Sequence, residues 1–223
     1  AHYVETVRSI GNELGRSIPI IQDLSGPRGQ DHDCHSFDAS KDMLTEKDLT
    51  DLEFGIAHTV DYIAMSYVGC AHDVESLKSH LHARGHPIRV IAKIERAAAL
   101  KNLDEIIAVS DGVMVARGDL GNEIPLEEIP FVEKDVISRA KAAGIPVITA
   151  TSMLESMRDH AVPARAEMTD IVYAVQCGSD AVMLSEETAL GTFPVEAVDY
   201  MDRAIMAAEA HTPKLPPLHP LTV

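Results

Sequence analysis

Six short apolar runs, rich in Val and Ile, recur along the chain with amphipathic stretches between them. The predicted strands are Ile18–Leu24, Tyr62–Val68, Ile88–Ile94, Gly112–Arg117, Pro146–Ala150 and Asp180–Ser185. These runs do not alternate between apolar and polar residues, which is typical of parallel strands covered on both faces. Helical periodicity separates them at Glu46–Ala57, Val74–Ala83, Glu128–Ala143 and Val195–Ala208. The alternation predicts an α/β protein built from βαβ units.

The number of strands leaves two α/β architectures open. A doubly wound sheet can have six strands, whereas a (β/α)₈ barrel needs eight. Two segments have no strong period: a polar connection over residues 25–43, and a Pro-rich tail that is expected to be extended. We therefore expect one domain over residues 1–211, followed by the tail over residues 212–223.

The negative charge of the chain excludes several kinds of partner. Lys and Arg total 19 and Asp and Glu total 35, which gives a formal net charge of −16. A surface that binds nucleic acid or an anionic membrane needs clustered cations, so we expect neither partner. No apolar run approaches the roughly 20 residues that cross a bilayer. The three cysteines form no C-x-x-C pair, which favours a reducing, cytoplasmic location.

Polar residues two apart stand where three of the predicted strands end. These pairs are Lys93 with Glu95, Arg117 with Asp119, and Ser185 with Glu187. Strand residues two apart point to the same face, roughly 6–7 Å from one another. The strand ends would then direct these side chains at one mouth, where α/β folds bind their ligands. For any single pair, an ordinary salt bridge on the rim is an equally good interpretation.

The residue types at these strand ends suit phosphoryl or enolate chemistry. Glu95 and Asp119 could hold Mg²⁺, which usually takes one or two carboxylates and fills its other positions with water and substrate oxygens. Lys93 could neutralise a transferring phosphoryl group or an enolate. Backbone N–H groups of residues 118–121 could receive an anion. Thr151 adds a hydroxyl, although alone it is better interpreted as a helix N-cap.

A run of acidic residues follows the second of these pairs. Its members, Glu127, Glu128, Glu133 and Asp135, fall within or next to a predicted helix. Charged residues in such a helix are usually exposed, so we expect this run to mark the solvated side of the helix.

Several long segments resemble the pyruvate kinase family, in that family's order. The central match is IRVIAKIERAAALKNLDEIIAVSDGVMVARGDLGNEIP over Ile88–Pro125. Further matches are Ile18–Gly29, Leu44–Val68, Pro146–Met157, Pro163–Val175 and Asp180–Val198. The resemblance implies a (β/α)₈ TIM barrel, with six of its eight strands in this chain. It also implies transfer of phosphate from phosphoenolpyruvate to ADP, giving pyruvate and ATP.

The resemblance assigns a role to each matching residue. Lys93 would stabilise the phosphoryl group and the enolate, and Thr151 would help to protonate the enolate carbon. Glu95 and Asp119 would bind the divalent cation, Mg²⁺ or Mn²⁺. Backbone amides of Gly118 and Asp119 would receive the substrate carboxylate.

Three further residues have roles implied by the same resemblance. Arg117 would order the loop that carries Gly118 and Asp119. Asp23 would bind a monovalent cation, normally K⁺. Ser66 would line the phosphate region.

The chain also departs from the family pattern. The family's first two barrel strands, its lid domain and its C-terminal domain have no match here, and residues 25–43 stand in place of the lid. We therefore expect the barrel to be completed by an N-terminal segment, or the chain to form a homo-oligomer. Two other functions stay open: a Mg²⁺-dependent lyase or decarboxylase acting on a pyruvate or oxaloacetate enolate without nucleotide, and a remnant that binds a metabolite without turnover.

Overall fold

All six predicted strands form in the computed structural model, which describes residues 1–29 and 36–212. The predicted tail lies outside these residues, apart from Thr212, and so does the middle of the predicted polar connection. The described residues divide into two compact units, residues 1–111 and residues 112–212. The three strands that each unit contributes run parallel, as the unbroken apolar runs predict.

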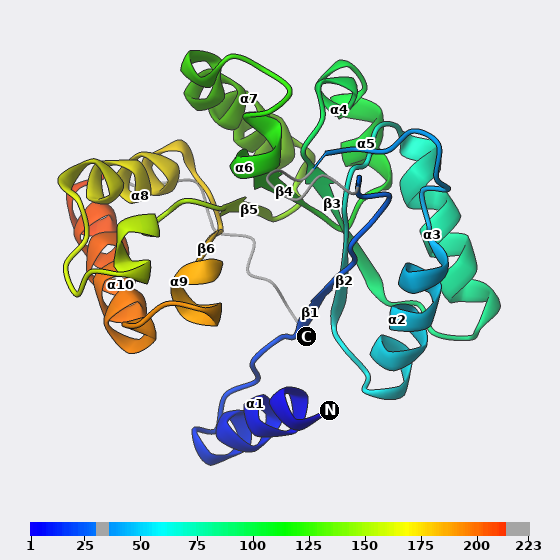
Figure 1. Ribbon diagram of the computed structural model, residues 1–223, viewed down its shortest axis with the longest axis horizontal. Coiled ribbons are helices and arrows are strands. Elements are labelled where there is room, and N and C mark those ends of the chain that lie inside the picture. The colour runs from blue at the N-terminus through cyan, green and yellow to red at the C-terminus, as the bar shows by residue number, and fades with distance from the viewer. Residues whose placement is uncertain (30–35, 213–223) are drawn as a thin grey trace. The chain divides into compact units, whose positions relative to one another are not determined.

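The first unit contains three strands, each with a helix after it (Figure 1). Its elements are α1 (His2–Glu13), β1 (Ile21–Asp23), α2 (Glu46–Ala57), β2 (Tyr62–Met65), α3 (Ala71–Ala83), β3 (Arg89–Ile94), α4 (Ala97–Lys101) and α5 (Leu103–Val109). β2 lies between β1 and β3, with Tyr62 beside Ile21 on one side and beside Arg89 on the other. Asp23, Ser66 and Lys93 therefore lie at or just beyond the ends of three neighbouring strands.

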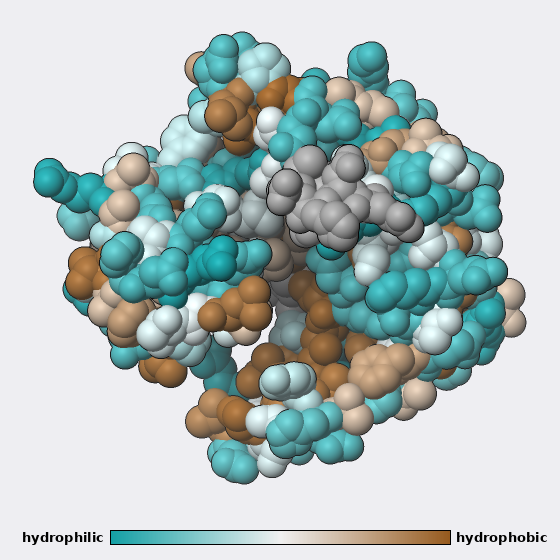
Figure 2. All heavy atoms as spheres, viewed as in Figure 1, coloured by the Kyte–Doolittle hydropathy of each residue, from teal (hydrophilic) through white to brown (hydrophobic). Residues whose placement is uncertain are grey.

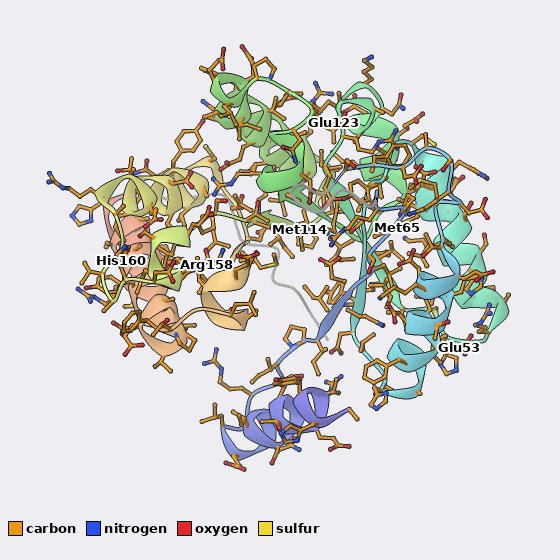
Figure 3. The ribbon with its side chains drawn as sticks, in the orientation of Figure 1. Glu53, Met65, Met114, Glu123, Arg158 and His160 are labelled. Atoms are coloured by element: carbon orange, nitrogen blue, oxygen red, sulfur yellow. The ribbon has the colours of Figure 1, made fainter. Side chains whose placement is uncertain are left out.

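Helices α2 and α3 show how the sequence determines this unit. Thr45 caps α2 and forms a reciprocal capping box with Asp48, so the helix begins where the sequence predicts. On α3, Val74, Leu77 and Leu81 are buried at helical spacing. Figure 3 shows Glu53 on the outer side of α2, where Arg84 pairs with it.

The second unit repeats the strand–helix pattern. Its elements are β4 (Gly112–Ala116), α6 (Arg117–Leu120), η1 (Leu126–Glu128), α7 (Ile129–Ala143), β5 (Val147–Ala150), η2 (Glu155–Arg158), α8 (Arg165–Cys177), β6 (Ala181–Met183), α9 (Glu186–Ala189) and α10 (Pro194–His211). β5 lies between β4 and β6. Gly144 ends α7 in the left-handed conformation, as its position after the last periodic residue predicts. α8, α10 and the segment around Met153 and Met157 bury a shared apolar core.

Four predicted strands end earlier than their sequences indicate: β1 ends at Asp23 and β2 at Met65, and the other two are β4 and β6. The ladder between β4 and β5 ends at the pair Ala116 and Ala150, and the backbone then turns into α6 from Arg117. β6 ends at Met183, and Ser185 precedes α9. The prediction that Arg117 and Ser185 belong to strands is therefore wrong. Their partners two residues on lie in short helices rather than on the same strand face.

Exposed apolar side chains gather on α1. Tyr3, Ile10 and Leu14 are exposed there, and Figure 2 shows hydrophobic atoms on this helix at the lower edge of the view. Among the described residues, no helix combines the length and the apolar character needed to span a membrane. Cys70 and Cys177 are free thiols, and Cys34 lies outside the described residues.

Candidate functional site

The strongest cluster of functional side chains in the first unit surrounds the ammonium group of Lys93. This residue is 6% exposed near the end of β3. Its Nζ lies 2.8 Å from Ser66 Oγ, 2.9 Å from Glu95 Oε1 and 3.1 Å from Asp23 Oδ1. An ammonium has three protons, so each can be donated to one of these oxygens. Figure 3 labels Met65, which directly precedes Ser66 at the end of β2.

The neighbours of Lys93 fix its charge. Burial opposes the charged form, but the carboxylates of Glu95 and Asp23 outweigh burial and raise the pKa of Lys93 above its usual value. Lys93 is therefore an ammonium at neutral pH. A permanently charged donor of this kind can stabilise developing negative charge, whereas it cannot act as a base.

Glu95 is held from both sides of its carboxylate. It is 1% exposed, and its Oε2 accepts a hydrogen bond of 2.7 Å from the backbone N–H of Tyr67. Tyr67 has a φ of +58°, a conformation that costs a residue other than glycine about 1–3 kcal/mol. Strain of this kind is concentrated at functional sites, which supports a functional interpretation of this cluster.

The same cluster has the chemistry of a hard-cation site. Two carboxylates face one ammonium, so the group carries a net negative charge with oxygen ligands, which Mg²⁺ prefers. Within residues 1–29 and 36–212, no three His, Cys, Asp or Glu side chains gather as a metal site. Mg²⁺ does not require three, because water and substrate fill its other positions. The carboxylates of this cluster therefore fit a divalent cation that takes some of its ligands from the protein and the others from water and substrate.

The second unit contains a buried ion cluster around Arg117. Its Nη1 lies 2.6 Å from Asp170 Oδ1 and 3.2 Å from Glu133 Oε2. Its Nη2 donates a hydrogen bond of 2.8 Å to the carbonyl oxygen of Thr151. The guanidinium thus ties the start of α6 to α7, to α8 and to the turn after β5. That Arg117 orders the loop that carries Gly118 and Asp119 stays a prediction.

Gly118 and Thr151, for which the family resemblance implies substrate binding and proton transfer, contact each other in this unit. The Gly118 N–H donates a hydrogen bond of 2.7 Å to Thr151 Oγ1, which in turn donates to the carbonyl oxygen of Ala150 at 2.6 Å. Thr151 has a φ of +70°, a second strained residue at a strand end. The helical segment after it, η2, begins only at Glu155, so the N-cap interpretation of Thr151 is wrong.

The structure divides the predicted site residues between the two units. Lys93, Glu95, Asp23 and Ser66 belong to the first unit and form one cluster. Arg117, Gly118, Asp119 and Thr151 belong to the second. The predicted cation ligands Glu95 and Asp119 fall in different units, so their sharing of one ion stays a prediction.

Glu133 and Asp170 are the site residues that sequence reasoning missed. The prediction that Glu133 lies on the solvated side of its helix is wrong, because it is 1% exposed and paired with Arg117. A signal was present: the buried positions of α7 are Glu133, Val136, Ile137 and Ala140, with the spacing of one helical face.

Glu187, of the third predicted pair, also has a different role. It is buried, and it accepts backbone hydrogen bonds from Ser185 and Leu154, so it supports the local fold. The prediction of a third polar pair directed at a ligand is therefore not supported by these contacts.

Glu133 gives the folded unit a specific dependence on pH. Burial raises its pKa above the ordinary 4.5, although Arg117 acts in the opposite direction. A carboxyl with a raised folded pKa stabilises the fold fully below its unfolded pKa, and that contribution is lost as pH rises through the folded pKa. We expect the stability of the protein relative to a Glu133→Gln variant to be highest below about pH 4 and to fall as pH rises through the raised pKa of Glu133. Urea denaturation at a series of pH values measures this difference, and a constant difference would contradict the prediction.

Each unit has a cavity, and only the cavity of the second unit is lined by residues of its ion cluster. The cavity of the first unit, of about 630 Å³, is lined by Gly26 and by charged side chains of both signs: Arg28, Lys41, Lys47, Asp42 and Glu46. Gly26 packs against Ser66, whose hydroxyl contacts Lys93. A cavity of about 550 Å³ in the second unit is lined by Arg117 and Gly118. Both cavities have room for small ligands beside charged groups.

Comparisons with known proteins give a consistent result. The family model described as "Pyruvate kinase, barrel domain" matches residues 33–198. A pyruvate kinase of Thermococcus litoralis is 47% identical over 174 residues, covering 78% of this chain and 37% of that protein. One from Sporosarcina psychrophila is 51% identical over 168 residues, covering 75% of this chain and 29% of that protein. Pyruvate kinase 2 of Synechocystis is 44% identical over 200 residues, covering 89% of this chain and 33% of that protein. The chain thus spans about a third of the length of the curated relatives it matches.

Proposed function

Because this chain belongs to the pyruvate kinase family, whose barrel domain it matches, we propose that it transfers a phosphoryl group from phosphoenolpyruvate to ADP, giving pyruvate and ATP. The predicted α/β barrel is confirmed by this membership, and the doubly wound sheet is excluded. One observation carries the proposed activity: a buried ammonium, Lys93, held by two carboxylates and a hydroxyl at the ends of three neighbouring strands.

Lys93 is proposed to stabilise charge in the reaction. Its carboxylate neighbours keep it protonated, so it can donate to a phosphoryl oxygen and then to the enolate that forms when the phosphoryl group leaves. Asp23 is the most exposed of its three partners, with 48% of its side chain accessible. An incoming phosphoryl oxygen could therefore replace Asp23 while Ser66 and Glu95 keep the ammonium in place.

The cations belong to the same proposal. Glu95 would supply a buried oxygen ligand to Mg²⁺ or Mn²⁺, and Asp119 is the second carboxylate that the sequence predicts. When bound, the divalent cation would neutralise charge on phosphoryl and enolate oxygens. Asp23 is proposed for K⁺, which would compete with its ion pair to Lys93.

Coupled measurements of product test the proposed reaction. We expect phosphoenolpyruvate and Mg²⁺ to give pyruvate only when ADP is present, and chelation of the divalent cation to abolish turnover. Oxaloacetate serves as a separate substrate in the same assay. Decarboxylation of oxaloacetate without nucleotide, in the absence of ADP-dependent turnover, would favour the lyase. Binding of phosphoenolpyruvate without any turnover would favour the interpretation of the chain as a non-catalytic remnant.

A cytoplasmic location and a homo-oligomer are further parts of the proposal. Light scattering measures the molar mass of the assembly and so tests the homo-oligomer.

Thr151 is proposed to deliver the proton to the enolate carbon. Its hydroxyl proton is donated to the carbonyl oxygen of Ala150, so it must turn toward the substrate to act. We expect Thr151→Ala to lower pyruvate formation by about 10²-fold or more, the usual contribution of a positioned proton donor. Thr151→Ser retains the hydroxyl and should stay within about tenfold of wild type. Wild-type turnover in Thr151→Ala would remove this residue from the mechanism.

A further inference from the structure

Two described parts of the connection between β1 and α2, residues 28–29 and 36–41, form hydrogen bonds with each other. Arg28 and Phe37 form an antiparallel bridge, and the Gly29 N–H donates a hydrogen bond of 2.7 Å to the carbonyl oxygen of Ser36. Lys41 Nζ donates to the carbonyl oxygen of Arg28 at 2.5 Å. These contacts give Phe37 a defined place in the first unit.

The ring of Phe37 contacts both a cation and a second ring. The guanidinium carbon of Arg96 is 3.5 Å from the centroid of the Phe37 ring, a close cation–π contact. The Tyr67 ring is centred 5.9 Å from it, at a tilt of 47°. Arg96 Nη1 also donates a hydrogen bond of 3.2 Å to the carbonyl oxygen of Tyr67. Phe37, Arg96 and Tyr67 thus contact one another, and we call these three residues the Phe37 clamp.

The Phe37 clamp acts on a strained residue. Tyr67 adopts its φ of +58° between the Arg96 contact at its carbonyl and the Glu95 contact at its N–H. Strained backbone persists only where its surroundings hold it. Gly26 adds to this support, because a methyl group at that position would come within 3.0 Å of the Tyr67 ring. Loss of the aromatic ring at position 37 would free Arg96 and allow Tyr67 to relax.

We propose that Phe37 is a positioning residue of the Lys93–Glu95 cluster: it fixes Arg96 and Tyr67, and thereby directs the Tyr67 N–H that orients the Glu95 carboxylate. Phe37 touches neither substrate nor cation in this account. Its effect reaches the cation site through one backbone hydrogen bond of 2.7 Å. The inference rests on the proposed function only in taking Glu95 as a cation ligand.

Binding of Mn²⁺, followed by electron paramagnetic resonance, tests the effect on the cation site. Partners that orient a metal ligand typically contribute 10–100-fold to metal affinity. We therefore expect Phe37→Ala to weaken Mn²⁺ binding about tenfold, and Phe37→Tyr, which retains an aromatic face over Arg96, to bind like wild type. Phe37→Leu retains apolar volume without that face and should resemble Phe37→Ala. Phe54→Ala is the matched control, because Phe54 is a phenylalanine of the same unit that stacks on His58.

Hydrogen exchange at the Tyr67 amide provides a second readout that needs no metal. We expect this amide to exchange faster in Phe37→Ala and at the wild-type rate in Phe54→Ala. If wild type binds no Mn²⁺ but Phe37→Ala still speeds Tyr67 exchange, the proposed cation site fails while the positioning role stands. Unchanged exchange in Phe37→Ala would overturn the inference. Equal weakening of Mn²⁺ binding by Phe37→Ala and Phe54→Ala would also overturn it, since a general loss of stability would then explain both.

Discussion

A Lys93→Met variant is expected to lose at least about 10²–10³-fold in ADP-dependent pyruvate formation, the usual cost of removing one preorganised donor to developing charge. The methionine has similar length but no proton to donate. Its introduction also leaves Glu95 buried without its ammonium partner, and breaking a buried ion pair typically costs about 3–5 kcal/mol. Steady-state kinetics and urea denaturation measure the two effects separately.

Lys141→Met is the matched control for this experiment. Lys141 forms an ion pair of 2.5 Å with the buried carboxylate of Asp180 in the second unit. Its loss should therefore also destabilise the fold, whereas turnover per folded molecule should stay near wild type. Wild-type turnover in Lys93→Met would defeat the assignment of Lys93. Equal loss of turnover in both variants would show that stability, rather than chemistry, limits the assay.

An Arg117→Met variant is expected to lower the free energy of unfolding of the second unit by about 3–5 kcal/mol. The reason is that Glu133 loses the only cation paired with it among the described residues, while it stays almost wholly buried. The hydrogen bond from Arg117 to the carbonyl oxygen of Thr151 is lost as well. Combining Arg117→Met with Glu133→Gln should restore part of the stability, because the uncompensated charge is removed. Urea denaturation of the two single variants and the double variant measures this coupling.

Arg139→Met provides the comparison, because Arg139 is an exposed cation of the same unit. Arg139 pairs with Asp135 on the exposed side of α7, and exposed pairs of this kind contribute about 0–1 kcal/mol. We expect Arg139→Met to stay within that range. If Arg117→Met lowers the free energy of unfolding no more than Arg139→Met does, the buried ion cluster around Arg117 does not stabilise the fold as we expect.

Much of the fold could be predicted from local patterns. Thr45 with Asp48 three residues later predicts the start of α2, and Gly144 predicts the end of α7, because capping depends on residues close in sequence. The six strands follow from short apolar runs without alternation. Strand ends were less predictable, because they depend on backbone pairing with a neighbouring strand, and between β4 and β5 this pairing ends at Ala116 and Ala150.

The alternation of strands and helices, the family resemblance and the pairing of Lys93 with Glu95 could all be predicted from the sequence, because each depends on residues close together in the chain. The burial of charged side chains and the identity of their partners, by contrast, became visible only in the folded chain. Glu133 and Asp170 reach Arg117 from positions 16 and 53 residues away. Phe37 contacts Arg96 although the strands β2 and β3 lie between them in the sequence. Such contacts could not be predicted from the sequence, because burial and ion pairing depend on the distance between residues in space rather than along the chain.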